Sequence, residues 1–136
     1  MKRFIGVMVV AGVLMALPAR AEVIGKTDAD VKAIADPLLE NVLQGMAKKN
    51  YAAYTHDFDA TMKETVSEPK FLERAAQIQN WLGNYLYREY LGFLNKDQMT
   101  VVFWKGSFDK TADEVLIKLI VSQRDKQYLI TGMTFE

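Results

Sequence analysis

The chain has 136 residues, half of them hydrophobic, and its 17 basic residues balance its 17 acidic ones. It contains no cysteine and a single histidine, so a disulfide framework is excluded and a structural zinc site is disfavoured. Nucleic-acid binding is disfavoured too, because it needs a basic face that neutralises phosphates.

Residues 1–21 have the order of a secretory signal. Two basic residues begin the chain, residues 4–17 are apolar, and a small-x-small triplet ends at Ala21. The apolar run is shorter than the roughly 20 residues that a membrane span needs. We therefore predict cleavage after Ala21, with an uncleaved anchor as the alternative. The product is a single domain, residues 22–136, in the periplasm or secreted, with no membrane attachment after cleavage.

The first half of this domain has helical spacing. Apolar residues every three or four positions predict a helix over residues 28–48, capped by Thr27 or Asp28. Pro37 interrupts it, and because the apolar stripe stays in phase we expect one kinked helix rather than a second helix capped by Asp36. Three further helical segments are expected: a short turn over residues 51–58, a turn from Asp59 to Met62, and a helix opened by Ser67 and stopped by Gly83.

After Gly83 the spacing changes to that of strands. Runs rich in β-branched and aromatic residues occupy residues 85–94, 99–108, 115–123 and 128–135. The gaps between them are short and polar, which favours antiparallel neighbours. Helices followed by such strands predict an α+β fold, with the helices packed on one face of a four-stranded antiparallel meander.

Two of these strands are apolar at consecutive positions, as in Val101-Val102-Phe103-Trp104 and Val115-Leu116-Ile117. A sheet with one wet face would alternate between apolar and polar residues. We therefore expect the second face to form a homodimer. The alternative is that these residues are scattered on an ordinary surface. Charged residues also lie within the strands, where they would mark a solvent-facing edge, guard that edge or line a pocket mouth: Arg88, Glu89, Lys105 and Lys118.

The order of the segments resembles the cystatin-like α+β cone of the nuclear-transport-factor-two-like superfamily, and more narrowly small exported bacterial domains of unknown function. The segments that carry the likeness include Asn50-Tyr51-Ala52-Ala53-Tyr54, Asp57-Phe58-Asp59, Glu89-Tyr90-Leu91-Gly92, Val101-Val102-Phe103-Trp104-Lys105-Gly106 and Tyr128-Leu129-Ile130-Thr131-Gly132. The resemblance implies a curved sheet and a cavity between helices and sheet. It leaves function open, because this superfamily hosts enzymes, binding modules and scaffolds.

His56, Asp57 and Asp59 are the candidates for acid/base chemistry. A histidine next to an aspartate could be a general base. However, adjacent side chains on a helix or turn point in different directions, so we do not expect Asp57 to orient His56. Asp59 is expected to cap the turn that follows it.

Aromatic residues are the candidates for binding a small apolar ligand, although cross-strand aromatic pairs also simply stabilise sheets. Strict alternation places Tyr85 and Tyr87 on one face, and Trp104 and Phe108 on one face. The full set is Tyr54, Trp81, Tyr85, Tyr87, Trp104 and Phe108. We predict no cofactor and no metal. The sequence favours a non-enzymatic domain that binds a small apolar ligand or a partner protein, with a cavity-carboxylate enzyme or a purely structural module as alternatives.

Overall fold

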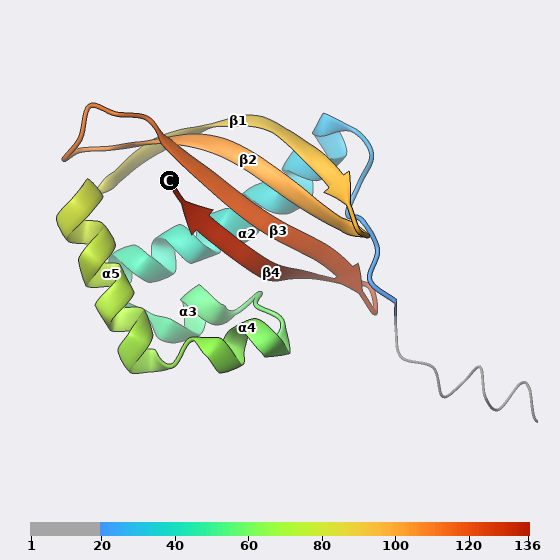
Figure 1. The fold of residues 1–136 in the computed structure, drawn as a ribbon, viewed down its shortest axis with the longest axis horizontal. Helices are drawn as coiled ribbons and strands as arrows, with labels where there is room; N and C mark the ends of the chain where they lie inside the picture. The colour runs from blue at the N-terminus through green and yellow to red at the C-terminus, as the bar shows by residue number, and fades with distance from the viewer. Residues whose placement is uncertain (1–19) are drawn as a thin grey trace, which may run out of the picture.

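The computed structural model describes residues 20–136, so most of the predicted secretory signal lies outside the described residues. Helices come first, and a sheet follows (Figure 1). The helices are α2 (Asp28–Lys48), α3 (Tyr51–Thr55), α4 (Ala60–Thr65) and α5 (Glu68–Leu82). The strands are β1 (Tyr85–Lys96), β2 (Met99–Phe108), β3 (Val115–Arg124) and β4 (Gln127–Phe135). The predicted α+β class is confirmed. No helix among residues 20–136 is long and apolar enough to cross a membrane.

The long helices begin and end where the sequence predicts. The Thr27 side chain caps α2 by accepting from the Asp30 N–H at 3.2 Å, and the helix continues through Pro37 as one element. Ser67 caps α5 in the same way. Gly83 ends α5 with a φ of 81°, and a Cβ at this position would lie 2.1 Å from Oδ1 of Asp109. Only glycine fits this turn without strain.

The sheet is an antiparallel meander with the strand order β1-β2-β3-β4. Two-residue turns join β1 to β2 and β3 to β4, and both residues of each turn, 97–98 and 125–126, have positive φ. Such tight turns match the twist of the flanking strands. Pairing therefore continues to the pairs Lys96–Met99 and Arg124–Gln127, which extends these strands by one or two residues beyond the predicted bounds.

β1 contains two irregularities in its pairing with β2. The register shifts between Tyr85 and Tyr87 and again between Tyr90 and Gly92, which leaves Leu86 and Leu91 as extra residues. A bulge of this kind bends the strand and changes which face the following side chains take. Residues 87–90 form a regular stretch between the two bulges.

The helices cover one side of the sheet, which we call the inner face; in Figure 1, α2 passes behind the strands. Side chains from the helices and this face form one continuous core. Its largest fully buried members are Trp104, Phe58, Phe71, Leu39, Leu82 and Ile117. These side chains occupy the space between the helices and the centre of the sheet, where the resemblance implied a cavity.

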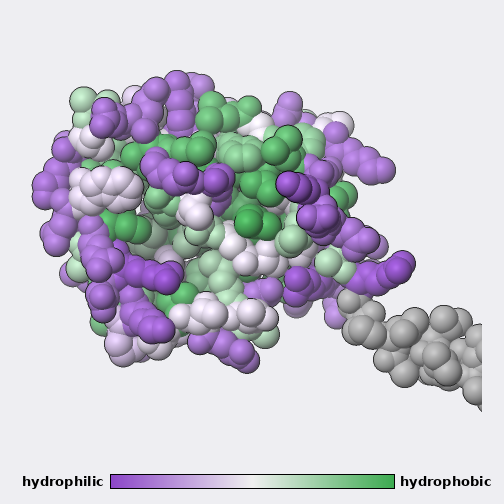
Figure 2. Space-filling view, viewed as in Figure 1, coloured by the Kyte–Doolittle hydropathy of each residue, from purple (hydrophilic) through white to green (hydrophobic). Residues whose placement is uncertain are grey.

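The opposite side, which we call the outer face, has no helix over it. Along β2, buried residues alternate with half-buried ones, so the outer face retains apolar side chains that are only partly covered. Figure 2 shows hydrophobic atoms gathered over β1 to β3, with hydrophilic atoms between them. The apolar residues of the outer face include Leu94, Val101, Phe103, Leu116 and Ile120.

Candidate functional site

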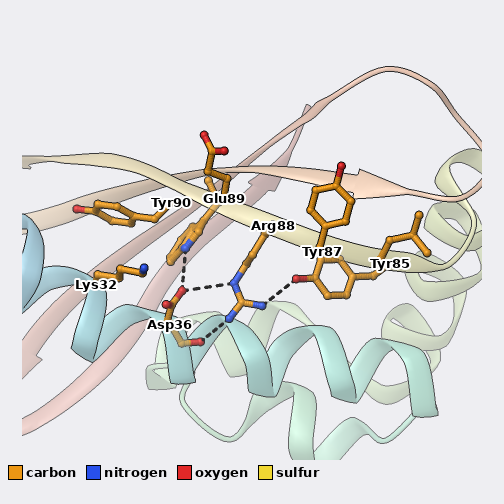
Figure 3. A pocket seen from close by; sticks show the side chains of 9 residues that line it. Lys32, Asp36, Tyr85, Tyr87, Arg88, Glu89 and Tyr90 are labelled. Atoms are coloured by element: carbon orange, nitrogen blue, oxygen red, sulfur yellow. Dashed lines mark hydrogen bonds and ion pairs between the residues drawn. The ribbon is translucent and has the colours of Figure 1, made fainter.

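A hollow of about 540 Å³ lies between α2 and the edge strand β1 (Figure 3), and we call it the edge hollow. Six consecutive residues of β1, 85–90, line it together with Trp104, Lys32 and Asp36. The hollow therefore runs along the strand.

Side chains of β1 alternate between the two faces of the strand, only one of which faces α2. Tyr85 and Arg88 point toward α2, whereas Tyr87 and Glu89 point away from it. The expectation that Tyr85 and Tyr87 share one face is wrong, because the bulge at Leu86 shifts the alternation by one residue. The matching expectation for Trp104 and Phe108 is confirmed, since both are buried on the inner face.

Asp36 is the centre of the polar contacts in the edge hollow. Its Oδ1 accepts a hydrogen bond from Nε1 of Trp104 at 2.9 Å and faces Nε of Arg88 at 3.4 Å. Its main-chain oxygen accepts from Nη2 of Arg88 at 3.3 Å. One residue of α2 is thereby bonded to both β1 and β2.

Arg88 completes the network. Its Nη1 donates to Oε1 of Glu40 at 2.8 Å and to the hydroxyl of Tyr85 at 3.0 Å. Burial acts to lower the pKa of Arg88, but the bonds to Glu40 and Tyr85 outweigh it and raise that pKa. The bond from Arg88, with a second from Gln44, lowers the pKa of Glu40. Both partners are therefore charged at neutral pH, so the network fixes α2 against β1 and is poorly suited to proton transfer.

Carboxylates outnumber cations along the edge hollow. The hydroxyl of Tyr90 donates to Oδ1 of Asp28 at 2.8 Å. The pKa of Tyr90 is raised, mainly because the hydroxyl is partly desolvated and secondly because it makes this hydrogen bond. Lys32 points into the hollow and makes no hydrogen bond or ion pair within residues 20–136. On the side of α2 the charged groups are Asp36, Lys32 and Arg88, which line the hollow, and Asp28 and Glu40, which are bonded to its lining residues Tyr90 and Arg88. Glu89 points to the other side, where it faces Lys105 at 4.0 Å. The local balance is negative.

The predicted aromatic set is divided among three hollows. Tyr85, Tyr87 and Trp104 line the edge hollow. Phe108, together with Tyr85, lines a hollow of about 150 Å³ between α2 and α5. Tyr54 and Trp81 line one of about 200 Å³ between α5 and β4. These residues form no common wall around one ligand.

His56 and Asp57 are closer partners than the sequence predicted. Nδ1 of His56 lies 2.9 Å from Oδ1 of Asp57, and Oδ2 of Asp57 accepts from Nδ2 of Asn41 at 3.0 Å. The expectation that Asp57 does not orient His56 is wrong, because α3 ends at Thr55 and the chain turns at residues 56 and 57. The His56 side chain is nevertheless 72% exposed, and neither residue lines any of the three hollows.

Asp59 has the capping role that the sequence predicted. Its Oδ1 accepts from the Met62 N–H at 2.8 Å. Its Oδ2 faces Nη1 of Arg124 at 3.3 Å, a contact that sequence reasoning did not find. The neighbouring Phe58 is buried and forms a parallel bridge with Ile130 of β4. These contacts attach the segment between α3 and α4 to the sheet.

Sequence reasoning also missed Asp36 and Glu40 as site residues. They lie four positions apart on one face of a helix and meet an arginine from a strand. A polar stripe at four-residue spacing, Lys32, Asp36, Glu40 and Gln44, beside the apolar stripe of the same helix is the signal that could have identified them. Within residues 20–136, no group of three or more His, Asp or Glu side chains is arranged to hold a metal ion.

One family model matches this chain, that of a protein of unknown function, DUF3887, over residues 40–133. The match runs from the second half of α2 to β4 and includes Glu40, Arg88 and Trp104. No curated protein and no solved structure matches the chain significantly. Because the family model covers more than half of the chain, this protein belongs to the DUF3887 family.

Proposed function

We propose that this chain is an exported, non-enzymatic binding domain that acts through its sheet, and that a second copy of the chain packs on its outer face. The uncovered apolar outer face is the observation that carries this proposal. Side chains of β1, β2 and β3 contribute to it, and Leu94 alone is 59% exposed. Exposed apolar side chains gathered on one face, with polar groups among them, commonly mark protein-binding surfaces.

The charges of the outer face favour a second copy as the occupant. Lys105 lies 2.8 Å from Glu114 and 4.0 Å from Glu89, and Lys118 lies 2.7 Å from Glu136. Each cation is neutralised within its own chain. Two copies can therefore meet face to face without like-charge repulsion, as a two-fold interface requires.

The size of the face also fits. Four strands of about ten residues, at a rise of about 3.3 Å and a spacing of about 4.8 Å, present roughly 600 Å² of flat area. A stable protein interface buries about 800 Å² of accessible surface on each partner, and side chains add to the flat area. The outer face is large enough for such an interface.

The other functions that the sequence left open receive less support. The hollows near Phe108 and near Tyr54 measure about 150 and 200 Å³, whereas small-molecule sites usually span about 300–1,000 Å³. The edge hollow, at about 540 Å³, lies within that range, but four charged residues line it, whereas sites for apolar ligands are lined mostly by hydrophobic side chains. An enzyme that uses His56, Asp57 or Asp59 would need these groups beside a hollow. His56 instead faces solvent, and Asp59 is committed to Met62 and Arg124.

The order of helices and meander further supports the cystatin-like α+β cone of the nuclear-transport-factor-two-like superfamily as the ancestry of this domain. The charged start, apolar run and small-x-small triplet of residues 1–21 support export. Expression in a Gram-negative host with fractionation and N-terminal sequencing tests this. We expect the periplasmic product to begin at Glu22; a cytoplasmic, uncleaved product would contradict export.

Sedimentation analysis of residues 22–136 over a wide concentration range tests the proposed dimer. We expect a dimer in the wild type and a monomer in Phe103→Glu and Leu94→Glu. Leu94 is exposed, so its variant should fold even if the Phe103 variant does not. Leu72→Glu, at a 41% exposed residue of α5, is the control and should remain dimeric. A wild type that stays monomeric, or a dimer that only the Leu72 variant disrupts, would overturn the proposal.

A further inference from the structure

β1 is an edge strand whose outer side is open. Within residues 20–136, no segment other than β2 exchanges main-chain hydrogen bonds with it. Residues of an antiparallel strand alternately bond to the partner strand and point their N–H and C=O groups away from it. In a hairpin with a two-residue turn, the residues that flank the turn exchange main-chain hydrogen bonds, so Lys96 and Met99 form a bonded pair. Because bonded and non-bonded pairs alternate, the odd-numbered residues of β2 donate to and accept from β1, and the even-numbered ones do not. The 2.9 Å bond from the Asp109 N–H to the Asn84 oxygen agrees with this alternation.

Arg88 and Tyr90 are paired with the even-numbered residues Gly106 and Trp104. Their main-chain N–H and C=O groups therefore point to the open edge. Both residues lie in the regular stretch between the two bulges, and both line the edge hollow. The open hydrogen-bonding groups and the hollow thus coincide along the same stretch of β1.

A strand that pairs with this edge would place alternate side chains on the two sides of the sheet. Those on the inner side would enter the edge hollow, where Asp36 and Glu40 are 31% and 44% exposed. Together with Asp28, which accepts from the lining residue Tyr90, these carboxylates outnumber the two cations, Lys32 and Arg88, by one. Those on the outer side would lie beside Tyr87, which is 64% exposed. The inner positions favour basic side chains and the outer positions favour apolar ones.

We propose that the free edge of β1 accepts an extended segment of a partner protein in which basic side chains alternate with apolar ones. The main chain of this segment pairs with Arg88 and Tyr90. Its basic side chains face the carboxylates of α2, and its apolar side chains extend the outer face. A second copy of β1 fits less well, because two copies would bring the same surplus of carboxylates together. This edge is distinct from the face through which two copies pack.

The probe is a blocked heptapeptide in which lysine alternates with valine, titrated into residues 22–136 with amide hydrogen exchange read by NMR. We expect the amides of Arg88 and Tyr90 to gain protection as the peptide binds. A peptide with glutamate in place of lysine should bind at least about tenfold more weakly. A peptide with a central proline should lose the protection, because proline removes a main-chain donor.

Variants of the protein test whether the lysine side chains of the peptide enter the edge hollow. Lys32→Ala removes the unpaired cation from the edge hollow and should tighten binding of the lysine peptide about two- to threefold. Lys70→Ala, on α5, is the matched control and should leave the affinity unchanged. The proposal is overturned if the lysine peptide does not bind, if it protects amides elsewhere but not at Arg88 and Tyr90, if the glutamate peptide binds equally well, or if Lys32→Ala has no effect.

Discussion

The indole nitrogen of Trp104 donates to the carboxylate of Asp36 at 2.9 Å and so joins the centre of the sheet to the middle of α2. Trp104 is fully buried, and Asp36 directly precedes Pro37. A buried donor without a partner is costly, so this bond specifies how α2 lies on the sheet. The same carboxylate faces Arg88, which extends the attachment to β1.

Asp36→Ala should lower the free energy of unfolding by about 2–4 kcal/mol, because it leaves the Trp104 donor and the Arg88 guanidinium without their acceptor. Asp36→Asn retains an acceptor oxygen and should cost less. Urea denaturation followed by circular dichroism measures both. Asp30→Ala, at an exposed residue in the first turn of the same helix, should cost less than about 1 kcal/mol. An equal loss in the Asp36 and Asp30 variants would contradict the assigned role.

Glu40 should make stability depend on pH. Its pKa is lowered in the folded state by Arg88, so its contribution is present above the usual pKa of about 4.3 and is lost as the pH falls through the folded-state value. The side chain is 44% exposed, so we expect less than about 1 kcal/mol at pH 7. Urea midpoints from pH 7 to pH 3 should fall less steeply in Glu40→Gln. In an Arg88→Gln background the effect of Glu40→Gln should shrink, because only the bond from Gln44 then still lowers the pKa of Glu40. An undiminished difference would assign the pH dependence to a group other than the Arg88–Glu40 pair.

Gly45 should not tolerate alanine, although alanine is the better helix former by about 1 kcal/mol. A Cβ here would lie 2.6 Å from the main-chain nitrogen of Tyr54 and 2.7 Å from its Cα, where α2 and α3 approach closely. Main-chain atoms cannot move aside as a flexible side chain can. We expect Gly45→Ala to lower the free energy of unfolding by about 1–3 kcal/mol. Gln44→Ala, on the exposed side of the helix, should change it by less than about 0.5 kcal/mol. A more stable Gly45 variant would show that the helices can separate freely.

Asp59 should contribute to stability through two separable contacts. Asp59→Ala removes both the cap of α4 and the acceptor for Arg124, and should cost about 1–2 kcal/mol. Asp59→Asn keeps a capping oxygen and should recover most of that loss. Thermal unfolding of the two variants separates the contacts. If asparagine is as harmful as alanine, the ion pair with Arg124, and not the cap, is the larger contribution.

The elements could be predicted because their signals are local. The apolar stripe through Pro37, the caps at Thr27 and Ser67 and the stop at Gly83 each depend on a few neighbouring residues. The strand ends were missed by one or two residues because the tight turns at residues 97–98 and 125–126 contain no glycine to mark them.

The site could be predicted only in part, because it depends on residues far apart in the sequence. Arg88 meets Asp36 across 52 positions and Glu40 across 48. Strict alternation from Tyr85 would also direct Arg88 outward; the extra residue Leu86 turns it inward, and such a bulge has no clear signature in the sequence. Which aromatic residues share a hollow was equally hidden.

The two extra residues of β1 also bear on aggregation. A long, exposed, apolar edge normally allows copies to stack without limit into fibres. Here each bulge bends the strand, so an added strand can align with the few residues between the bulges and cannot continue beyond them. The molecule can thus display Leu86, Tyr87, Leu91 and Leu94 on one edge strand and still resist forming filaments.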